Sequence, residues 1–292
     1  MNKFKILVLS MLISMIVYSI SSFPTNSKAQ LSVGPLSTWI WNTKSIITNS
    51  DQILSFLAEN QTKTVFLQIN YNIKPASYET FVKKASQHHI EVHALEGAPD
   101  WISAKGNTYS NRFFDWLKMY QAQAEPSEKF TGIHLDVEPY LYSGWNSNYK
   151  NTVLSYQTLL IKAKDLSSQM GLKIGADIPF WFDEKLYNNK LGKGNLAAWV
   201  IKNMDLPTIM AYRDQADGPN GMKAIIQQEV EIAQSIGKRI TIAVETAPSS
   251  EAEYVSFYEE GQTVMLEQLS KLSNVNNDFA IHYLDSWMSM KP

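Results

Sequence analysis

Three ionisable residues occupy every second position of a short apolar segment near the middle of the chain. The segment Phe-Thr-Gly-Ile-His-Leu-Asp-Val-Glu-Pro-Tyr, residues 130–140, contains His134, Asp136 and Glu138. Because side chains alternate between the two faces of a β-strand, this spacing places all three on one face. Burying charge is unfavourable unless a partner or a reaction uses it. The pattern therefore indicates a functional site on this strand.

The chemistry that this spacing suggests is acid catalysis by a carboxyl pair. Two neighbouring acids in a partly dry site push their pKa values apart. Glu138, the uppermost of the three, could then stay protonated near neutral pH and act as a general acid. Asp136 would lie one layer below it and His134 below that, as a partner to Asp136. Paired carboxyl groups are what cleavage of a glycosidic bond requires.

Eight apolar segments that could position such a site alternate with helical patterns along the chain. The predicted strands are 37–42, 64–70, 90–96, 132–138, 172–178, 207–212, 239–245 and 279–285. Among the helical signals, Pro75 begins one helix, and Gly171 and Gly237 end two others. Eight strand–helix repeats in about 250 residues predict a single (β/α)₈ TIM barrel, an α/β fold. A doubly wound open sheet is the alternative, but it usually has fewer strands and a Gly-rich first turn.

A barrel of this kind places its active site at the C-terminal ends of the strands. Those ends are Asn42, Asn70, Glu96, Glu138, Asp177, Tyr212, Glu245 and Asp285. Several acids therefore converge on one mouth, where we expect Glu96, Asp177 and Asp285 to contact substrate. Strand ends are also where chains become exposed, which is the alternative explanation for any one of these acids.

Tryptophans gather at the same end of the predicted barrel. At or just after strand ends lie Trp39, Trp41, Trp101, Trp145, Trp181 and Trp287. Flat rings stack on the apolar faces of sugars, so these residues suit a saccharide site. Tyr140 and Trp145, close to Glu138, form the best candidate wall. The alternative for each ring is that it covers the top of the barrel. Trp116 and Trp199 fall within helices and are predicted to be core.

The segment 130–140 resembles the fourth-strand signature of family 18 glycoside hydrolases, the chitinase-like barrels. Their pattern is Phe-Asp-Gly-Ile-Asp-Leu-Asp-Trp-Glu, which this chain matches at Phe130, Gly132, Ile133, Leu135, Asp136 and Glu138. Two further motifs are similar to theirs. Met210 and Tyr212 resemble the sixth-strand motif, with Arg213 inserted before Asp214, and Trp287 resembles the tryptophan that follows strand eight.

The resemblance implies a role for each matching residue. Glu138 would protonate the leaving glycosidic oxygen, Asp136 would orient an acetamido group of the substrate that attacks the anomeric carbon, and Tyr212 would hydrogen-bond that group. Arg213, beside Tyr212, is expected to contact substrate. Thr131 and His134 replace two aspartates of the family pattern, and Val137 replaces an aromatic residue.

Three other functions remain open at this point. Val137-Glu138-Pro139 is similar to the acid/base motif of the large retaining-glycosidase clan, whose nucleophile ends strand seven, where this chain has Glu245. Glu245 could instead form an ion pair with Arg213. A carbohydrate-binding barrel without catalysis would explain Thr131 and His134, and a metal-dependent hydrolase or lyase would use the acids as oxygen ligands.

No zinc-binding spacing and no Gly-x-Ser-x-Gly motif is present in the sequence, and we predict no cofactor. His282 and Asp285 are three positions apart in the predicted strand, so their side chains should point to opposite faces. With Asp285 at the mouth, His282 is expected to face a helix.

The first 29 residues have the pattern of a secretory signal peptide. Lys3 and Lys5 precede an apolar run, and small residues at Ser27 and Ala29 precede a cut. We therefore expect a secreted protein whose barrel domain spans residues 30–292. A membrane anchor is the alternative. The chain has no cysteine, so it has neither a lipobox nor disulfides. The full chain has a formal net charge of −2, and removal of residues 1–29, which contain three lysines and no acid, would leave 23 − 28 = −5. This negative charge disfavours nucleic acid and anionic membranes as partners. A monomer that binds a polysaccharide or oligosaccharide is expected.

Overall fold

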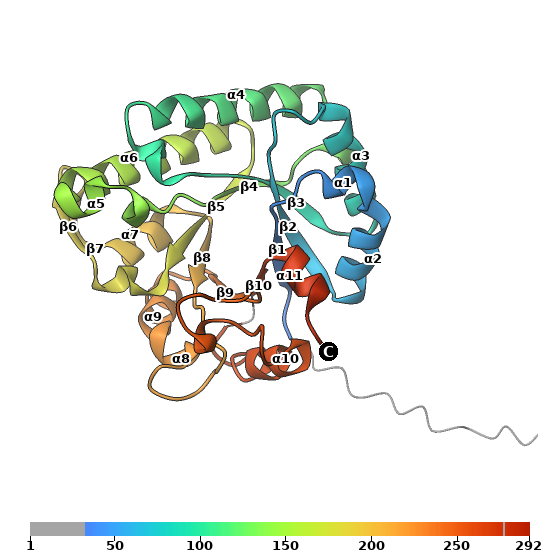
Figure 1. Ribbon diagram of the computed structural model, residues 1–292. Helices are drawn as coiled ribbons and strands as arrows, with labels where there is room; N and C mark the ends of the chain where they lie inside the picture. Colours follow the sequence, from blue (N-terminus) through green and yellow to red (C-terminus); the bar gives the residue numbers. More distant parts are fainter. Residues whose placement is uncertain (1–32, 277) are drawn as a thin grey trace, which may run out of the picture. The chain divides into compact units, whose positions relative to one another are not determined.

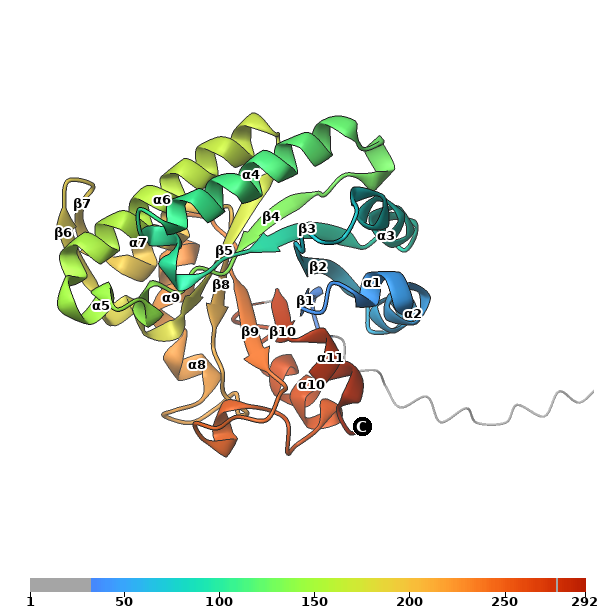
Figure 2. The same ribbon diagram turned by 45° about the horizontal axis from the view of Figure 1, so that its top comes forward.

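Eight parallel strands close into a barrel in the computed structural model, which describes residues 33–276 and 278–292 (Figures 1 and 2). Around the barrel the strand order is β1-β10-β9-β8-β5-β4-β3-β2. The barrel strands are β1 (Leu36–Ile40), β2 (Thr62–Gln68), β3 (Glu91–Glu96), β4 (Gly132–Leu135), β5 (Lys173–Pro179), β8 (Leu206–Met210), β9 (Thr241–Glu245) and β10 (Phe279–His282). The predicted (β/α)₈ barrel is confirmed, with each predicted strand within a few residues of its observed position.

Helices surround the strands on the outside of the barrel (Figure 2). The α-helices are α1 (Ser45–Thr48), α2 (Ser50–Glu59), α3 (Pro75–Gln87), α4 (Gly106–Gln123), α5 (Gly144–Ser147), α6 (Tyr149–Gln169), α7 (Leu196–Asn203), α8 (Met222–Ile225), α9 (Gln227–Ser235), α10 (Gln262–Ser270) and α11 (Leu284–Ser289). Short 3₁₀ helices are η1 (Pro99–Ile102), η2 (Pro126–Glu128), η3 (Pro139–Leu141), η4 (Phe180–Glu184) and η5 (Glu253–Val255).

The helix boundaries follow the sequence signals closely. Pro75 is the first residue of α3, where its missing N–H costs nothing. After α6 and after α9, Gly171 and Gly237 adopt positive φ angles of 70° and 64°. Glycine reaches this left-handed conformation without steric cost, so each residue ends its helix and turns the chain toward the next strand.

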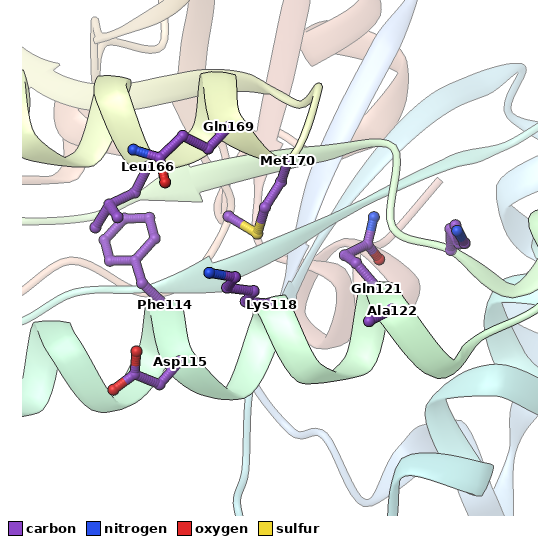
Figure 3. Close-up of a pocket in the computed structure, with 9 residues that line it drawn as sticks. Phe114, Asp115, Lys118, Gln121, Ala122, Leu166, Gln169 and Met170 are labelled. Atoms are coloured by element: carbon purple, nitrogen blue, oxygen red, sulfur yellow. The ribbon is translucent and has the colours of Figure 1, made fainter.

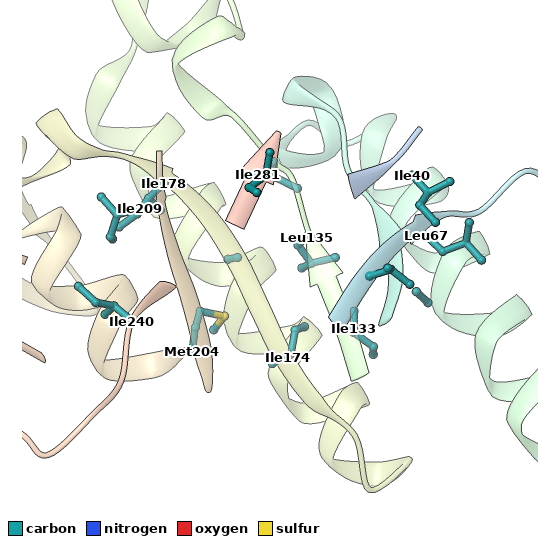
Figure 4. Close-up of a cluster of buried hydrophobic side chains, with 14 of the residues drawn as sticks. Ile40, Leu67, Ile133, Leu135, Ile174, Ile178, Met204, Ile209, Ile240 and Ile281 are labelled. Atoms are coloured by element: carbon teal, nitrogen blue, oxygen red, sulfur yellow. The ribbon is translucent and has the colours of Figure 1, made fainter. Parts of the chain in front are cut away.

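Two separate apolar layers lie on the two sides of the strands. The larger layer packs strands against helices and includes Ile133 and Leu135, which are labelled in Figure 4. Val137 belongs to the same layer. The smaller layer fills the barrel interior and consists of Trp39, Phe66, Leu95, Ala243 and Ala280. The predicted alternation of the β4 segment is therefore confirmed: its aliphatic residues face the helices, and its ionisable residues face the barrel axis.

A two-stranded antiparallel hairpin between β5 and α7 was not predicted. Its strands are β6 (Leu186–Asn189) and β7 (Gly192–Asn195). The hairpin contacts α6 through Asn189, whose amide donates to Gln157 Oε1 at 2.8 Å. Its last residue, Asn195, caps α7 by accepting from the Ala198 N–H at 2.8 Å. Polar residues and glycines dominate both strands, so no hydrophobic alternation marked them in the sequence.

The predicted signal peptide, residues 1–29, lies outside the described residues. Within the described part of the chain, no helix combines the length and the apolar character needed to cross a membrane.

Gly171→Ala should destabilise the fold. The residue has a φ of 70°, and an added Cβ would meet no atom within 4 Å, so the loss comes from backbone strain alone. We expect the free energy of unfolding to fall by roughly 1 kcal/mol, measured by urea denaturation. Gln169→Ala, at the exposed last residue of α6, should change it by less than about 0.5 kcal/mol. Equal stability of Gly171→Ala and the native chain would contradict this account.

Candidate active site

Glu138 lies just beyond the C-terminal end of β4, where the chain turns into η3. It is partly buried, and its Oε1 accepts a hydrogen bond from the Tyr140 hydroxyl. Pro139, between the two, begins η3 and brings Tyr140 back over Glu138. The predicted acid therefore lies at the mouth of the barrel, where it is hydrogen-bonded to Tyr140.

Asp136 is partly buried, as Glu138 is, but its Oδ1 atom is shielded from solvent. Its backbone N–H donates to the Glu96 carbonyl at 3.1 Å, so strand pairing continues beyond the end of β4. Burial, followed by the charges of Asp177 and Glu138, raises the pKa of Asp136 well above its usual value, and His282 acts in the opposite direction. Its Oδ1 atom is buried and has no hydrogen-bond partner among the described residues. A buried acceptor without a partner is unfavourable, so Oδ1 is available to a ligand.

The expected pairing of His134 with Asp136 is wrong: His134 Nε2 lies 2.8 Å from Oδ1 of Asp177 on the neighbouring strand β5. Adjacent strands are about 4.8 Å apart, whereas same-face neighbours on one strand are separated by two residues, so the cross-strand partner is nearer. Gly175, opposite His134 in the register, makes room for the ring, because a Cβ there would lie 2.9 Å from His134 Nδ1.

The His134–Asp177 pair sits inside the barrel. The His134 ring stacks on Phe66 with centroids 3.7 Å apart, and burial lowers its pKa to about 3. Burial raises the pKa of Asp177 well above its usual value, although the Trp39 N–H, 3.3 Å from Oδ2, opposes the shift. Trp39 is 1% exposed and Asp177 is 3% exposed. The prediction that Trp39 contacts sugar is therefore wrong, because this indole supports Asp177 from within the barrel.

Glu245, at the end of β9, is held by three hydrogen bonds. Its Oε1 accepts from the N–H groups of Thr246 at 2.8 Å and Ala247 at 2.7 Å, and its Oε2 lies 2.7 Å from His282 Nδ1. Trp41 donates from Nε1 to His282 Nε2 at 3.0 Å. The suggested Glu245–Arg213 ion pair is thus wrong among the described residues, and His282 takes that place.

His282 is the residue that sequence reasoning missed, since it was expected to face a helix. It faces the barrel because β10 ends at His282 and α11 begins at Leu284, so strand alternation does not extend to Asp285. Counting from Ala280, which lies in the barrel interior two residues earlier, would have given the observed direction.

Tyr212 lies near His282, the partner of Glu245, and its pKa also responds to Asp136, Glu138 and Asp177. Its ring stacks on His282 with centroids 5.9 Å apart. Burial raises the pKa of Tyr212 well above its usual value, and four carboxyl charges add to the shift in the order Glu245, Asp177, Asp136 and Glu138. The predicted catalytic residues therefore gather around one tyrosine.

An aromatic cluster extends from Glu138 over the loops that follow β4 and β5. Tyr140 contacts Trp181 edge-on with centroids 5.0 Å apart, and Trp145 stacks on Phe182 at 5.7 Å. Trp145 and Trp181 are partly exposed. The structure thus brings together the rings predicted as a wall and adds Trp181 from the next loop.

Two of the predicted substrate-binding residues are buried in the core, and a third lines another cavity. Trp101 is 3% exposed and packs on Phe113. Trp287 is 1% exposed and packs on Phe56 in the layer between strands and helices. Asp285 is exposed on α11, where it lines a cavity of about 650 Å³ together with Ala247 and Tyr283, which follow the C-terminal ends of β9 and β10. Trp101 and Trp287 follow strand ends in the sequence, but the chain enters helices there and their side chains pack in the core.

Arg213 and Glu96 lie near the ends of β8 and β3. Arg213 donates from Nη1 to the Tyr212 carbonyl at 2.7 Å and from Nε to Asn220 Oδ1 at 3.2 Å. Glu96 lines a cavity of about 340 Å³ together with Trp41. Arg213 therefore stabilises the loop after β8 through these two hydrogen bonds, whereas Glu96 and Trp41 line a cavity that a ligand could enter.

Other features of the described chain are separate from this site. A groove between α4 and α6, where Phe114 and Leu166 lie against each other, is on the outside of the barrel (Figure 3). Among the described residues, no group of three or more His, Asp and Glu side chains is arranged to hold a metal ion.

Asp177→Asn should flatten the pH dependence of stability. Because the folded-state pKa of Asp177 is raised, folding takes up a proton above the unfolded pKa of about 3.9, and stability falls as the pH rises toward the folded value. The amide cannot ionise, so the decline from about pH 4 to 7 should be shallower by up to about 1.4 kcal/mol per pH unit. Urea denaturation at several pH values measures this slope.

Asp217→Asn is the matched control. Lys223 lowers the pKa of this exposed carboxyl, so its contribution to stability is lost only as the pH falls below about 4. A parallel decline in Asp177→Asn and the native chain would contradict the raised pKa.

Comparison with known proteins supports the fold. No family model and no curated protein matches the sequence. Among solved structures, the glycoside hydrolase domain of PgaB (BpsB) from Bordetella bronchiseptica is 9% identical with a TM-score of 0.53, over 88% of this chain and 96% of that one. A chitinase from Bacteroides thetaiotaomicron is 10% identical with a TM-score of 0.50, over 87% and 91%.

A Group IV chitinase from Ostrinia furnacalis, solved in complex with allosamidin, is 13% identical with a TM-score of 0.51, over 73% of this chain and 66% of that one. At these identities the similarity concerns the fold alone. The chain has a (β/α)₈ barrel similar to those of chitinases and other glycoside hydrolases, as the motif in β4 implied.

Proposed function

We propose that this protein hydrolyses glycosidic bonds in a polysaccharide, with Glu138 as the general acid. The observation that carries the proposal is the gathering of Asp136, Glu138 and Tyr212 at the barrel mouth, with the buried Oδ1 of Asp136 lacking a partner. Two neighbouring carboxyl groups, one enclosed and one at the rim, suit acid catalysis of bond cleavage.

The proposed reaction uses an acetamido group of the substrate as the nucleophile. Glu138 transfers its proton to the leaving glycosidic oxygen while the acetamido carbonyl oxygen attacks the anomeric carbon. Asp136 Oδ1 accepts the acetamido N–H, and the Tyr212 hydroxyl donates to the acetamido oxygen. Water then attacks the anomeric carbon, opens the cyclic intermediate and returns a proton to Glu138. The unpartnered Oδ1 of Asp136 thus gains a hydrogen bond during the reaction.

Glu245 has a supporting role in this mechanism. Both of its oxygens already accept hydrogen bonds, from two backbone N–H groups and from His282. This arrangement fixes His282 against Tyr212 more readily than it frees an oxygen to attack carbon. A covalent intermediate on Glu245 is therefore the alternative that the experiments must separate.

The two departures from the family motif leave the mouth intact. Thr131 is exposed at the N-terminal start of β4, where its hydroxyl donates to the Val92 carbonyl at 3.3 Å. His134 belongs to the pair with Asp177 rather than to Asp136. Neither substitution removes a group from the rim, which favours an active enzyme over a barrel that only binds sugar.

Export is part of the proposal. A signal peptide over residues 1–29 would deliver the barrel to the cell exterior, where polymeric saccharides are accessible. A monomeric state is also part of the proposal.

Trp145→Ala and Trp181→Ala should each weaken saccharide binding. Both rings are partly exposed in the aromatic cluster beside Glu138, and loss of one stacking contact should cost on the order of 1 kcal/mol. Calorimetric titration with a soluble oligosaccharide measures the loss. Ile236→Ala, an exposed apolar truncation that follows α9 and precedes β9, is the control. Unchanged affinity in both tryptophan variants would show that these rings only cover the barrel.

Glu138→Gln should abolish most hydrolysis, because the amide keeps the shape but cannot supply a proton. Loss of general acid catalysis typically lowers the rate by about 10²–10⁴-fold. Asp136→Asn should be nearly as damaging and Glu245→Gln mild, measured as kcat on an N-acetylated oligosaccharide. Glu59→Gln, on the exposed end of α2, is the matched control.

The same variants separate the alternatives. Abolished turnover in Glu245→Gln with a mild effect of Asp136→Asn would indicate a covalent intermediate on Glu245. Full activity of Glu138→Gln would overturn both mechanisms. Loss of activity with a chelator would indicate the metal-dependent alternative.

A further inference from the structure

The cavity at the C-terminal ends of β1, β2 and β3 adjoins the carboxyl groups of the candidate active site. Trp41 belongs to its lining and also donates a hydrogen bond to His282, the partner of Glu245. Its volume of about 340 Å³ is comparable with that of small-ligand sites. The cavity is therefore placed to hold a sugar residue next to the cleaved bond.

Arg112, on α4, is the one cationic side chain in the lining of this cavity. Its guanidinium lies over the Tyr71 ring, 3.9 Å from the centroid. The Arg112 side chain is exposed. Among the described residues it forms neither an ion pair nor a hydrogen bond. Stacking on an aromatic face orients the guanidinium plane and leaves its N–H groups at the edges. Arg112 thus presents a pre-oriented set of donors to the cavity.

Arg213, near the end of β8, shows the contrasting arrangement. Its guanidinium also lies over aromatic rings, those of Phe180 and Tyr254. Its Nη1 and Nε atoms, however, donate to the Tyr212 carbonyl and to Asn220. One arginine near the mouth is therefore occupied by the protein, and the other is free to bind a ligand.

Glu96 does not neutralise Arg112 by direct pairing. Its Oε2 accepts the Gly97 N–H at 3.0 Å, and no ion pair joins it to Arg112 among the described residues. Burial raises the pKa of Glu96, whereas hydrogen bonds from Gly97, Gln68 and Tyr71 and the positive charge of Arg112 act in the opposite direction. Arg112 therefore lies close enough to affect Glu96 through its charge, while its N–H groups keep no hydrogen-bond partner among the described residues.

We propose that Arg112 and this cavity bind the carboxylate of an acidic sugar residue, so that the substrate is a polysaccharide containing such residues. This inference rests on the proposed glycosidase function. A guanidinium binds a carboxylate through two parallel N–H groups, which a neutral hydroxyl cannot match. Glu245, whose oxygens accept three hydrogen bonds, contributes a carboxylate that would repel an anionic glycan. A free cation in the cavity lined by Trp41 offsets that repulsion and places the carboxylate of the glycan away from Glu245.

The test compares matched glycans in the full chain with Glu138→Gln, which prevents hydrolysis. The first probe is a hexasaccharide of alternating N-acetylglucosamine and its lactyl-ether acid, and the second is the same hexasaccharide with every carboxylate converted to the amide. A hexasaccharide of alternating N-acetylglucosamine and glucuronic acid tests the other source of carboxylate. Calorimetric titration at low and high salt gives each Kd.

We expect at least one acidic glycan to bind about tenfold more tightly than the neutral amide at low salt. This preference should shrink at high salt and disappear when Arg112→Gln is added. The tighter of the two acidic probes identifies the source of the carboxylate. Arg239→Gln is the matched control, because Arg239 pairs with Asp278 where β9 and β10 begin; the preference should persist in it.

Equal binding of acid and amide, or an equal loss for both in Arg112→Gln, would overturn the inference. Hydrolysis of a neutral chitin hexasaccharide by the native chain reports separately on the proposed function. If that glycan is cleaved while no carboxylate preference exists, only the inference fails. If no glycan is bound or cleaved, both fail.

Discussion

Burial of two carboxyl groups at the top of β4 and β5 is the constraint on which the rest of the site depends. Asp136 and Asp177 lie close enough for the charge of Asp177 to raise the pKa of Asp136, in a region with little water. Enclosed acids of this kind are unfavourable unless they are neutral or hydrogen-bonded. The protein supplies partners for Asp177, in His134 and Trp39, and leaves one oxygen of Asp136 without any.

The interior of the barrel is shaped by this requirement. Phe66 supports the His134 ring by stacking, and Gly175 leaves space for it. Close to Asp136, a Cβ on Gly97 would lie 2.1 Å from the Asp136 carbonyl oxygen, so only glycine permits this approach of β3 to β4. Small and aromatic residues therefore occupy the positions where an ordinary barrel would pack aliphatic layers.

A second group of polar contacts stabilises the opposite part of the mouth. Trp41, His282 and Glu245 form a chain of hydrogen bonds that joins β1, β10 and β9. Tyr212 stacks on His282, and its pKa is raised by burial and by the charges of all four carboxyl groups. The aromatic cluster after β4 and β5 and the cavity beside Arg112 then extend the mouth on the neighbouring strands, which suits a polymer better than a single sugar.

The sequence by itself determined the eightfold order of strands, the face on which Asp136 and Glu138 lie, and the helix ends at Gly171 and Gly237. Each of these depends on periodicity or backbone preference within one element, which local sequence records directly. Only the tertiary structure decided that His134 pairs with Asp177, that His282 holds Glu245, and that Trp101 and Trp287 are buried. These contacts join different elements, and they depend on strand register and barrel closure, which no single segment encodes.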